Sequence, residues 1–181
     1  GGTGSWTNVA TANWSATSGG AGGASAPTLA DDVIFDAGSN TGTGAFTVTV
    51  STGAVCRNIS FGGAGGNLDG AMTLAGTAAW SIYGSMTLVS TNLTFSYSGA
   101  ITFASTTTGQ TITSAGKIFS GTLNFNGVGG GLTLQDPLSV SASSGFNLLA
   151  GAVNTNNQTV TSTGGSSNFI TSGTATRSLT L

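Results

Sequence analysis

The sequence predicts an all-β protein built from short strands joined by glycine-rich turns. Apolar residues alternate with Thr or Ser in many short segments, which puts the apolar side chains on one face of each strand. Clusters of Gly, Asn and Ser separate these segments, and glycine alone fills 31 of the 181 positions. No stretch has the apolar spacing of an amphipathic helix, because Gly and β-branched residues interrupt every candidate.

Strands are expected wherever the alternation is unbroken, because β-branched and aromatic residues favour an extended backbone. The glycine runs at 62–66 and 127–131 lack the Lys and Ser or Thr of a phosphate-binding loop, and we predict that both are turns. In chain order, the expected strands are Asp32–Phe35, Phe46–Val50, Asn58–Phe61, Met72–Leu74, Met86–Leu88, Leu93–Phe95, Ile101–Phe103, Leu123–Phe125, Leu132–Leu134, Leu138–Val140, Thr159–Thr161 and Leu179–Leu181.

An apolar–Thr–apolar unit recurs at irregular spacing between Met72 and Leu134, and two architectures explain such a repeat. In a parallel β-solenoid, the short strands of successive turns stack and bury their inward side chains against one another. In an antiparallel β-sandwich or jelly roll, the same strands pair within two packed sheets. The outward Thr and Ser residues favour the solenoid, because stacked parallel strands accept ladders of small polar side chains but not of like charges.

The composition divides the chain into two parts. Residues 1–30 hold two of the three Trp residues and a glycine-rich stretch, with little alternation, and we expect an N-terminal cap or lead-in segment there. Residues 31–181 are expected to form a single β-repeat domain. A stacked core needs a cover for its terminal turn, and the bulky side chains of Trp6 and Trp14 are the expected cover.

The scarcity of charge excludes several classes of function. Only 4% of the residues are charged, where about 25% is typical, and there is no His. Without imidazole, and with Cys56 as the only thiol, the usual general bases and zinc-ligand patterns are missing. A net charge of -2 argues against a nucleic-acid surface, and no apolar run has the length of a membrane span. We therefore expect no enzymatic activity, no cofactor, no metal, no nucleic-acid partner and no membrane span.

The one acidic cluster, Asp31, Asp32 and Asp36, has two possible roles. Carboxylates with backbone carbonyls bind Ca²⁺, but the spacing matches neither an EF-hand loop nor a glycine-rich calcium repeat. The preferred interpretation is that these residues form turns and strand edges, with Val33 and Phe35 pointing inward and Asp32 and Asp36 outward. A carboxylate pair for polysaccharide cleavage is the weakest interpretation, because nothing in the sequence indicates a general acid with a raised pKa.

The aromatic residues and the single cysteine are expected to be structural. An aromatic ring can stack on a sugar ring, so each Trp and Tyr is also a candidate for glycan binding. Packing in the core or the cap is the preferred interpretation, and Cys56, next to Val55 in an apolar segment, is expected to be a buried, inert thiol. The aromatic residues concerned are Trp6, Trp14, Trp80, Tyr83 and Tyr97.

Several segments carry a resemblance to known proteins; they are Gly1–Trp6, Asn13–Ser15, Ser18–Ser25, Pro27–Thr28, Asp31–Asp36 and Asn126–Asp136. Their order resembles the Gly/Ser/Thr-rich β-strand repeat modules of large bacterial surface proteins, including autotransporter-like passengers, and of uncharacterised phage structural proteins. The resemblance implies a secreted or virion-associated protein with a structural or adhesive role. It includes no catalytic motif, and such modules usually occur in tandem, whereas this sequence holds one.

The sequence ends in mid-alternation, and we expect Ser178, Leu179, Thr180 and Leu181 to form a self-assembly strand. The predicted function is therefore that of a structural subunit of an extracellular or virion-associated filament, joined head to tail to identical subunits. The alternative is a glycan-binding adhesin or phage fibre module that recognises cell-surface glycans. A polysaccharide-degrading β-helix is a third, weaker hypothesis. The expected location is extracellular, at the cell surface or on a virion.

Overall fold

The computed structural model describes residues 3–6, 13–39, 44–62, 67–89, 91–141, 145–163 and 169–181. In this part the chain is all-β, and its one helical segment is the short 3-10 turn η1 (Ala37–Ser39). No helix of the described residues is long and apolar enough to span a membrane. The expected all-β class is confirmed.

The strands are short, apart from two longer ones in the C-terminal half. Their bounds are β1 Gly4–Ser5, β2 Val33–Phe35, β3 Phe46–Val50, β4 Ala54–Cys56, β5 Ile59–Phe61, β6 Met72–Gly76, β7 Trp80–Ile82, β8 Met86–Thr87, β9 Leu93–Tyr97, β10 Ile101–Phe103, β11 Gln110–Thr113, β12 Ile118–Phe119, β13 Leu123–Leu134, β14 Leu138–Val140, β15 Phe146–Asn154, β16 Val160–Ser162, β17 Phe169–Thr171 and β18 Arg177–Thr180.

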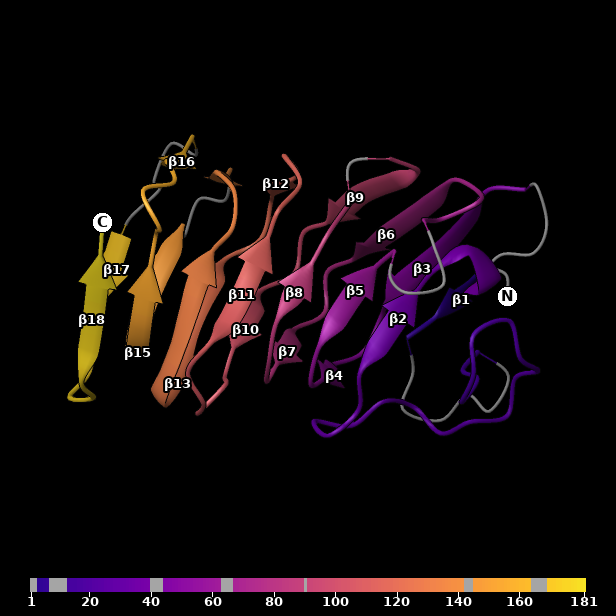
Figure 1. Cartoon of the computed structure of the whole chain (residues 1–181), viewed down its shortest axis with the longest axis horizontal. Coiled ribbons are helices and arrows are strands. Elements are labelled where there is room, and N and C mark those ends of the chain that lie inside the picture. The colour runs from indigo at the N-terminus through magenta and orange to yellow at the C-terminus, as the bar shows by residue number, and fades with distance from the viewer. Residues whose placement is uncertain are drawn as a thin grey trace.

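Every strand pairing in the described residues is parallel, so the fold is a β-solenoid and not an antiparallel sandwich. The chain winds through about 6 turns along the long axis, from the N-terminus to the C-terminus (Figure 1). Successive turns stack their strands into three walls. The first wall is β1-β3-β6-β9 followed by β12-β14-β16, the second is β4-β7-β10-β13-β15-β17, and the third is β2-β5-β8-β11-β13-β15-β18.

Apart from the longer step from Gly4 to its partner Val48, one turn of the solenoid takes 21 to 27 residues, as the contacts between stacked corners show. The apolar–Thr–apolar unit of the sequence is therefore one strand of a turn. Its spacing is irregular because consecutive units lie on different walls, separated by corners of unequal length. β13 and β15 differ from the other strands, since each runs around a corner and belongs to both the second and the third wall.

The core fills the interior between the three walls, and the inward side chains stack from turn to turn. In β3 the burial alternates strictly, with Phe46, Val48 and Val50 inward and two Thr residues on the outer side. A ladder of stacked phenylalanine rings follows the second wall through Phe103, Phe125, Phe146 and Phe169, with ring centroids 5.3, 4.4 and 5.2 Å apart. Offset-stacked rings add attraction to the burial of their apolar surface, so the ladder links successive turns.

Small polar side chains form the ladders expected on the outer surface. On the second wall, the Asn124 amide donates to Thr102 Oγ1 at 3.4 Å, and the Asn147 amide donates to Asn124 Oδ1 at 2.8 Å. These residues occupy matching positions of three successive turns. Neutral amides and hydroxyls can both donate and accept, so an identical stack of them is attractive where a stack of like charges would repel.

The prediction that residues 127–131 form a turn is wrong, because the whole run lies within β13. The chain stays extended here while it rounds the corner, with irregularities in its register against β15 between Phe125 and Gly131. Glycine is required by a close approach of the neighbouring turn. A Cβ atom on Gly127 or Gly130 would lie 1.8 Å from the backbone oxygen of Ser105. Of the other predicted turn, Gly62 is buried directly after β5, and residues 63–66 lie outside the described residues.

Candidate functional site

The two ends of the solenoid differ. They contain the residues that the sequence predicted for the N-terminal cap and for the self-assembly strand. At the N-terminal end, Trp6 is fully buried and follows β1, which pairs with β3. The Trp6 amide donates to the Thr49 carbonyl at 2.8 Å, and its ring packs on Trp80 at 5.3 Å. The half-buried Trp14 meets Trp6 edge to face at 5.0 Å. Both Trp residues therefore lie over the first turn of the core.

A cavity of about 310 Å³ lies at this N-terminal end, between residues 13–22 and the strands β1, β2 and β3. Trp14 lines it on one side, and Ile34, Phe35 and Asp36 line it on the other. The lead-in segment is fixed to the strands by polar contacts. Asn13 donates to the Ser5 carbonyl at 2.7 Å, and the Ser18 hydroxyl donates to Asp36 Oδ1 at 2.9 Å. The N-terminal end is thus partly covered but keeps an open space beside β2.

The burial of residues in and beside β2 agrees with the prediction for Asp32, Val33 and Phe35 and contradicts it for Asp36. Val33 and Phe35 are buried, and Asp32 is exposed, as expected. Asp36 was expected on the outer face but is buried, with 4% of its surface exposed. The strand ends at Phe35, and Asp36 instead starts η1, where its Oδ1 accepts from the Gly38 amide at 3.0 Å.

The three aspartates of the acidic cluster each have separate partners. Asp31 accepts from the hydroxyl and the amide of Thr28, at 2.6 and 2.8 Å, and these bonds lower its pKa. Asp32 forms a two-bonded ion pair with Arg57, at 2.8 and 2.7 Å, which lowers the pKa of Asp32. Within the described residues, no three acidic, Cys or His side chains gather as a metal ion would need. Their hydrogen bonds place Asp31 and Asp36 at turns and Asp32 at a corner between stacked turns.

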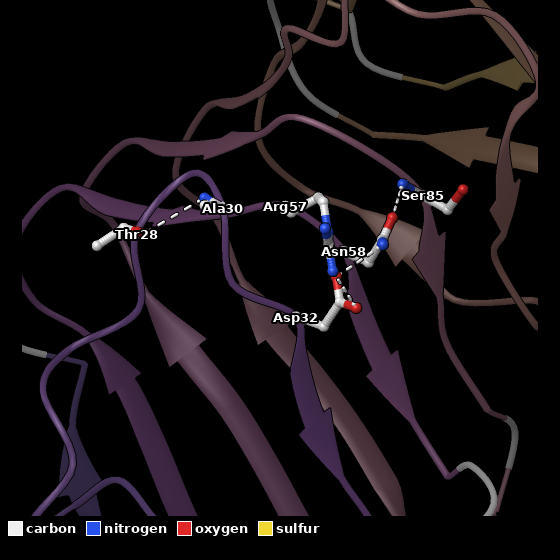
Figure 2. A network of polar contacts seen from close by, with 6 residues as sticks. All are labelled: Thr28, Ala30, Asp32, Arg57, Asn58 and Ser85. Atoms are coloured by element: carbon white, nitrogen blue, oxygen red, sulfur yellow. Dashed lines mark hydrogen bonds and ion pairs between the residues drawn. The ribbon is translucent and has the colours of Figure 1, made fainter. Parts of the chain in front are cut away.

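Asp32 also begins a polar ladder along the corner that precedes the third wall (Figure 2). Asn58 of the next turn donates its amide to Asp32 at 2.7 Å and accepts from the Ser85 amide at 2.7 Å with its Oδ1. The Ser85 hydroxyl continues the ladder to Gln110 at 3.1 Å and Thr111 at 3.0 Å. Four successive turns are thus linked at one corner by side chains. In the same view, the Thr28 hydroxyl accepts from the Ala30 amide and shapes the chain just before Asp31.

The aromatic candidates for glycan binding are mostly core residues. Trp6, Trp80 and Tyr97 are at most 1% exposed, which leaves no ring face for a sugar. Burial raises the pKa of Tyr97, and its hydroxyl donates to backbone carbonyls of the corner at Ala78 and Ala100. The preferred interpretation of these three residues as packing residues is confirmed. Only the half-buried Trp14 and the exposed Tyr83 keep accessible surface.

The single cysteine lies in the core, on β4, as expected. Burial raises the pKa of the Cys56 thiol to about 12, so almost no thiolate exists near neutral pH. We expect Cys56 to react with a thiol reagent such as Ellman's reagent only after the chain unfolds. Release of the coloured thiolate with and without denaturant measures this. Rapid reaction of the folded chain at pH 8 would contradict the burial.

The C-terminal end has no cover among the described residues. β16, β17 and β18 each pair with the preceding turn on one side, and their opposite edges have no partner strand in the part of the chain that the structure describes. The apolar side chains of this last turn are exposed: Val160 by 38%, Phe169 by 53%, Leu179 by 39% and Leu181 by 82%. The ring of Phe169 is the last in the phenylalanine ladder, with one face stacked and the other open.

The residues expected to form a self-assembly strand lie at this open end. Ser178, Leu179 and Thr180 belong to β18, which pairs with β15, and Leu181 follows directly. The sequence did not indicate β17, because Phe169 and Ile170 are adjacent apolar residues without alternation. The signal for β17 was the spacing of phenylalanines in the sequence. The separations from Phe125 to Phe146 and from Phe146 to Phe169 each match the length of one turn. A search for aromatic residues at the period of the turn finds it.

Comparisons with protein-family models, with curated proteins and with solved structures found no match for this chain.

Proposed function

We propose that this protein is a structural subunit that stacks head to tail into an extended β-solenoid filament, at a cell surface, outside the cell or on a virion. The observation that carries the proposal is the open C-terminal turn formed by β16, β17 and β18. It presents strand edges that have no partner among the described residues, together with the exposed side chains of Phe169, Leu179 and Leu181. Unpaired edges with apolar side chains are templates for pairing with another chain.

The arrangement of the edge strands supports head-to-tail stacking. At the N-terminal end, β1, β4 and β2 are the edge strands of the first, second and third walls. At the C-terminal end, β16, β17 and β18 are the edges of the same three walls. A second copy placed on the long axis thus brings β1 opposite β16 and β2 opposite β18, whereas β4 lies one turn further inside than β1 and β2. A contact between two different surfaces does not close on itself, so it continues into a filament.

The scarcity of charge fits the same function. A filament of identical subunits repeats every contact along its length, so a single like-charge contact would recur at every interface. The outer surface carries Thr, Ser and Asn ladders in place of charges, and these ladders can continue from one subunit to the next. Backbone hydrogen bonds and apolar stacking are then the forces that hold the filament.

Electron microscopy and light scattering of the purified chain test this function. We expect regular filaments from the unaltered chain and their loss when Leu181→Asp or Phe169→Asp places a charge on the open end. Val128→Asp is the matched control, because Val128 is 66% exposed on the side of the solenoid, in β13. Monodisperse particles from the unaltered chain would overturn the proposal. Equal loss of filaments in the Val128 control would show that any added charge disrupts them.

A second candidate function is glycan binding at the N-terminal cavity, because Trp14 and polar side chains line it together. An aromatic face beside a carboxylate and hydroxyl groups suits a neutral sugar ring. A glycan array with the unaltered chain and with Trp14→Ala tests this candidate. Binding that Trp14→Ala removes would favour an adhesin or fibre module, whereas no binding to any glycan would exclude this role for the cavity.

A further inference from the structure

We infer that β2 is the acceptor for β18 of a second copy, with Leu179 opposite Val33 and Arg177 opposite Asp31. This inference rests on the proposed head-to-tail stacking and assigns its register. β2 and β18 are the two ends of the same wall, which runs β2-β5-β8-β11-β13-β15-β18. Stacking β18 on β2 therefore extends an existing parallel sheet, with the strand direction unchanged.

The side-chain period limits the register to a few choices. Leu179 pairs with the buried Val153 and points to the interior, and Leu181 lies two residues further along. In β2 the inward residues are Val33 and Phe35. A shift by one residue would turn the apolar side chains outward, so Leu179 lies opposite Asp31, Val33 or Phe35.

Charge decides among these three registers. With Leu179 opposite Asp31, Leu181 lies opposite Val33 and Arg177 lies opposite Leu29, which carries no charge. With Leu179 opposite Val33, Arg177 lies opposite Asp31 and beside Asp32. With Leu179 opposite Phe35, Arg177 lies opposite the buried Val33, where its charge has no partner. Within its own chain, the described partners of Arg177 are carbonyl oxygens, those of Ser172 at 2.7 Å, Gly173 at 2.9 Å and Leu149 at 3.5 Å. Its positive charge is therefore available for a carboxylate of the neighbouring subunit.

The same charges favour head-to-tail over tail-to-tail contact. Asp31, Asp32 and Arg57 give the N-terminal end a net negative charge, whereas Arg177 is the last charged residue at the C-terminal end. Two C-terminal ends in contact would bring Arg177 against its own copy. Opposite charges across an interface attract the correct partner and like charges reject the wrong one.

The cavity at the N-terminal end gives the exposed Leu181 a place in the interface. In the inferred register, Leu181 lies opposite Phe35, and Phe35 lines the cavity. Leu181 is 82% exposed in the single chain, so stacking would remove a large apolar side chain from water.

Engineered disulfides test the register, because Cys56 is the only natural cysteine and is buried. Thr180→Cys with Ile34→Cys places two outward thiols opposite each other in adjacent strands, about 5 Å apart, which suits a disulfide. We expect a ladder of disulfide-linked oligomers on a non-reducing gel after mild oxidation. The matched control is Ser178→Cys with Ile34→Cys, displaced by two residues, where we expect no ladder.

A second test is Arg177→Glu, which we expect to abolish filaments, and a charge swap with Asp31→Arg is expected to restore them.

The possible outcomes distinguish a failure of the inferred register from a failure of the proposed function. If Thr180→Cys with Ile34→Cys forms filaments but no cross-links, the register is wrong and head-to-tail stacking stands. The same holds if the control, Ser178→Cys with Ile34→Cys, cross-links equally well. Disulfide dimers of Thr180→Cys alone would show tail-to-tail contact and overturn both. A monodisperse chain would overturn both as well, and binding of a neutral glycan by that chain would assign the cavity to a sugar.

Discussion

Replacing Gly127 by alanine is expected to destabilise the solenoid by about 3 kcal/mol or more, as severe overpacking does. The new Cβ atom would lie 1.8 Å from the Ser105 oxygen and 2.8 Å from the Ser105 carbonyl carbon. Both are backbone atoms of the adjacent turn, so no side-chain rotation relieves the contact. The corner between the second and the third wall would have to open, which separates paired strands. Thermal unfolding followed by circular dichroism measures the loss, with an expected fall in Tm of roughly 10 °C.

Gly131→Ala is the matched control for Gly127→Ala. Gly131 lies in the same strand, and its added Cβ atom would meet nothing closer than Thr108 Cγ2, at 3.5 Å. We therefore expect Gly131→Ala to unfold close to the temperature of the unaltered chain. A Gly127→Ala variant as stable as this control would show that the corner has more room than the structure gives it.

Replacing Phe125 by alanine is expected to cost about 3–5 kcal/mol, the range found for large aromatic residues in cores. Phe125 is 1% exposed, and its ring stacks between those of Phe103 and Phe146 at 5.3 and 4.4 Å. Removal of the ring leaves a cavity in the middle of the ladder and breaks the aromatic link between two turns. Urea titration gives the free energy of unfolding of the variant and of the unaltered chain.

Phe169→Ala provides the comparison at the end of the same ladder. Phe169 stacks on Phe146 at 5.2 Å but is 53% exposed, so its loss removes one contact and little burial. We expect a much smaller loss of stability than for Phe125→Ala, together with weaker self-association. Equal losses at the two positions would contradict the burial difference.

Much of the fold follows from the alternation in the sequence. The Phe46–Val50 strand was predicted with its observed bounds, and Leu138–Val140 likewise, because each carries an unbroken apolar–polar–apolar pattern. The parallel solenoid was preferred over the sandwich on the outward Thr and Ser residues, and the ladders at Thr102, Asn124 and Asn147 confirm that reasoning. Trp6 and Trp14 were expected to cover the first turn because of their bulk and their place before the first predicted strand; Trp6 follows the short strand β1 and is fully buried.

Other features depend on contacts between turns, which the local sequence does not carry. The strand Trp80–Ile82 was missed because its residues read as an isolated aromatic segment, although it lies between strands of adjacent turns. From the sequence alone, Gly127 and Gly130 look like turn residues. The close approach of the Ser105 backbone explains why glycine is needed at these positions. The proposed interface includes Leu179 and Leu181, which the sequence singled out, whereas Phe169 and the proposed acceptor β2 emerge only when the walls are assembled.

The parallel stacking of the turns also determines how the protein responds to force. A pull along the long axis loads the hydrogen bonds between turns directly, so the turns would separate one at a time. Neighbouring strands are about 5 Å apart, whereas an unwound turn of 21 to 27 residues extends to roughly 70–95 Å. A stretched molecule would therefore lengthen in steps of one turn and absorb work at each step, as an extensible tether does.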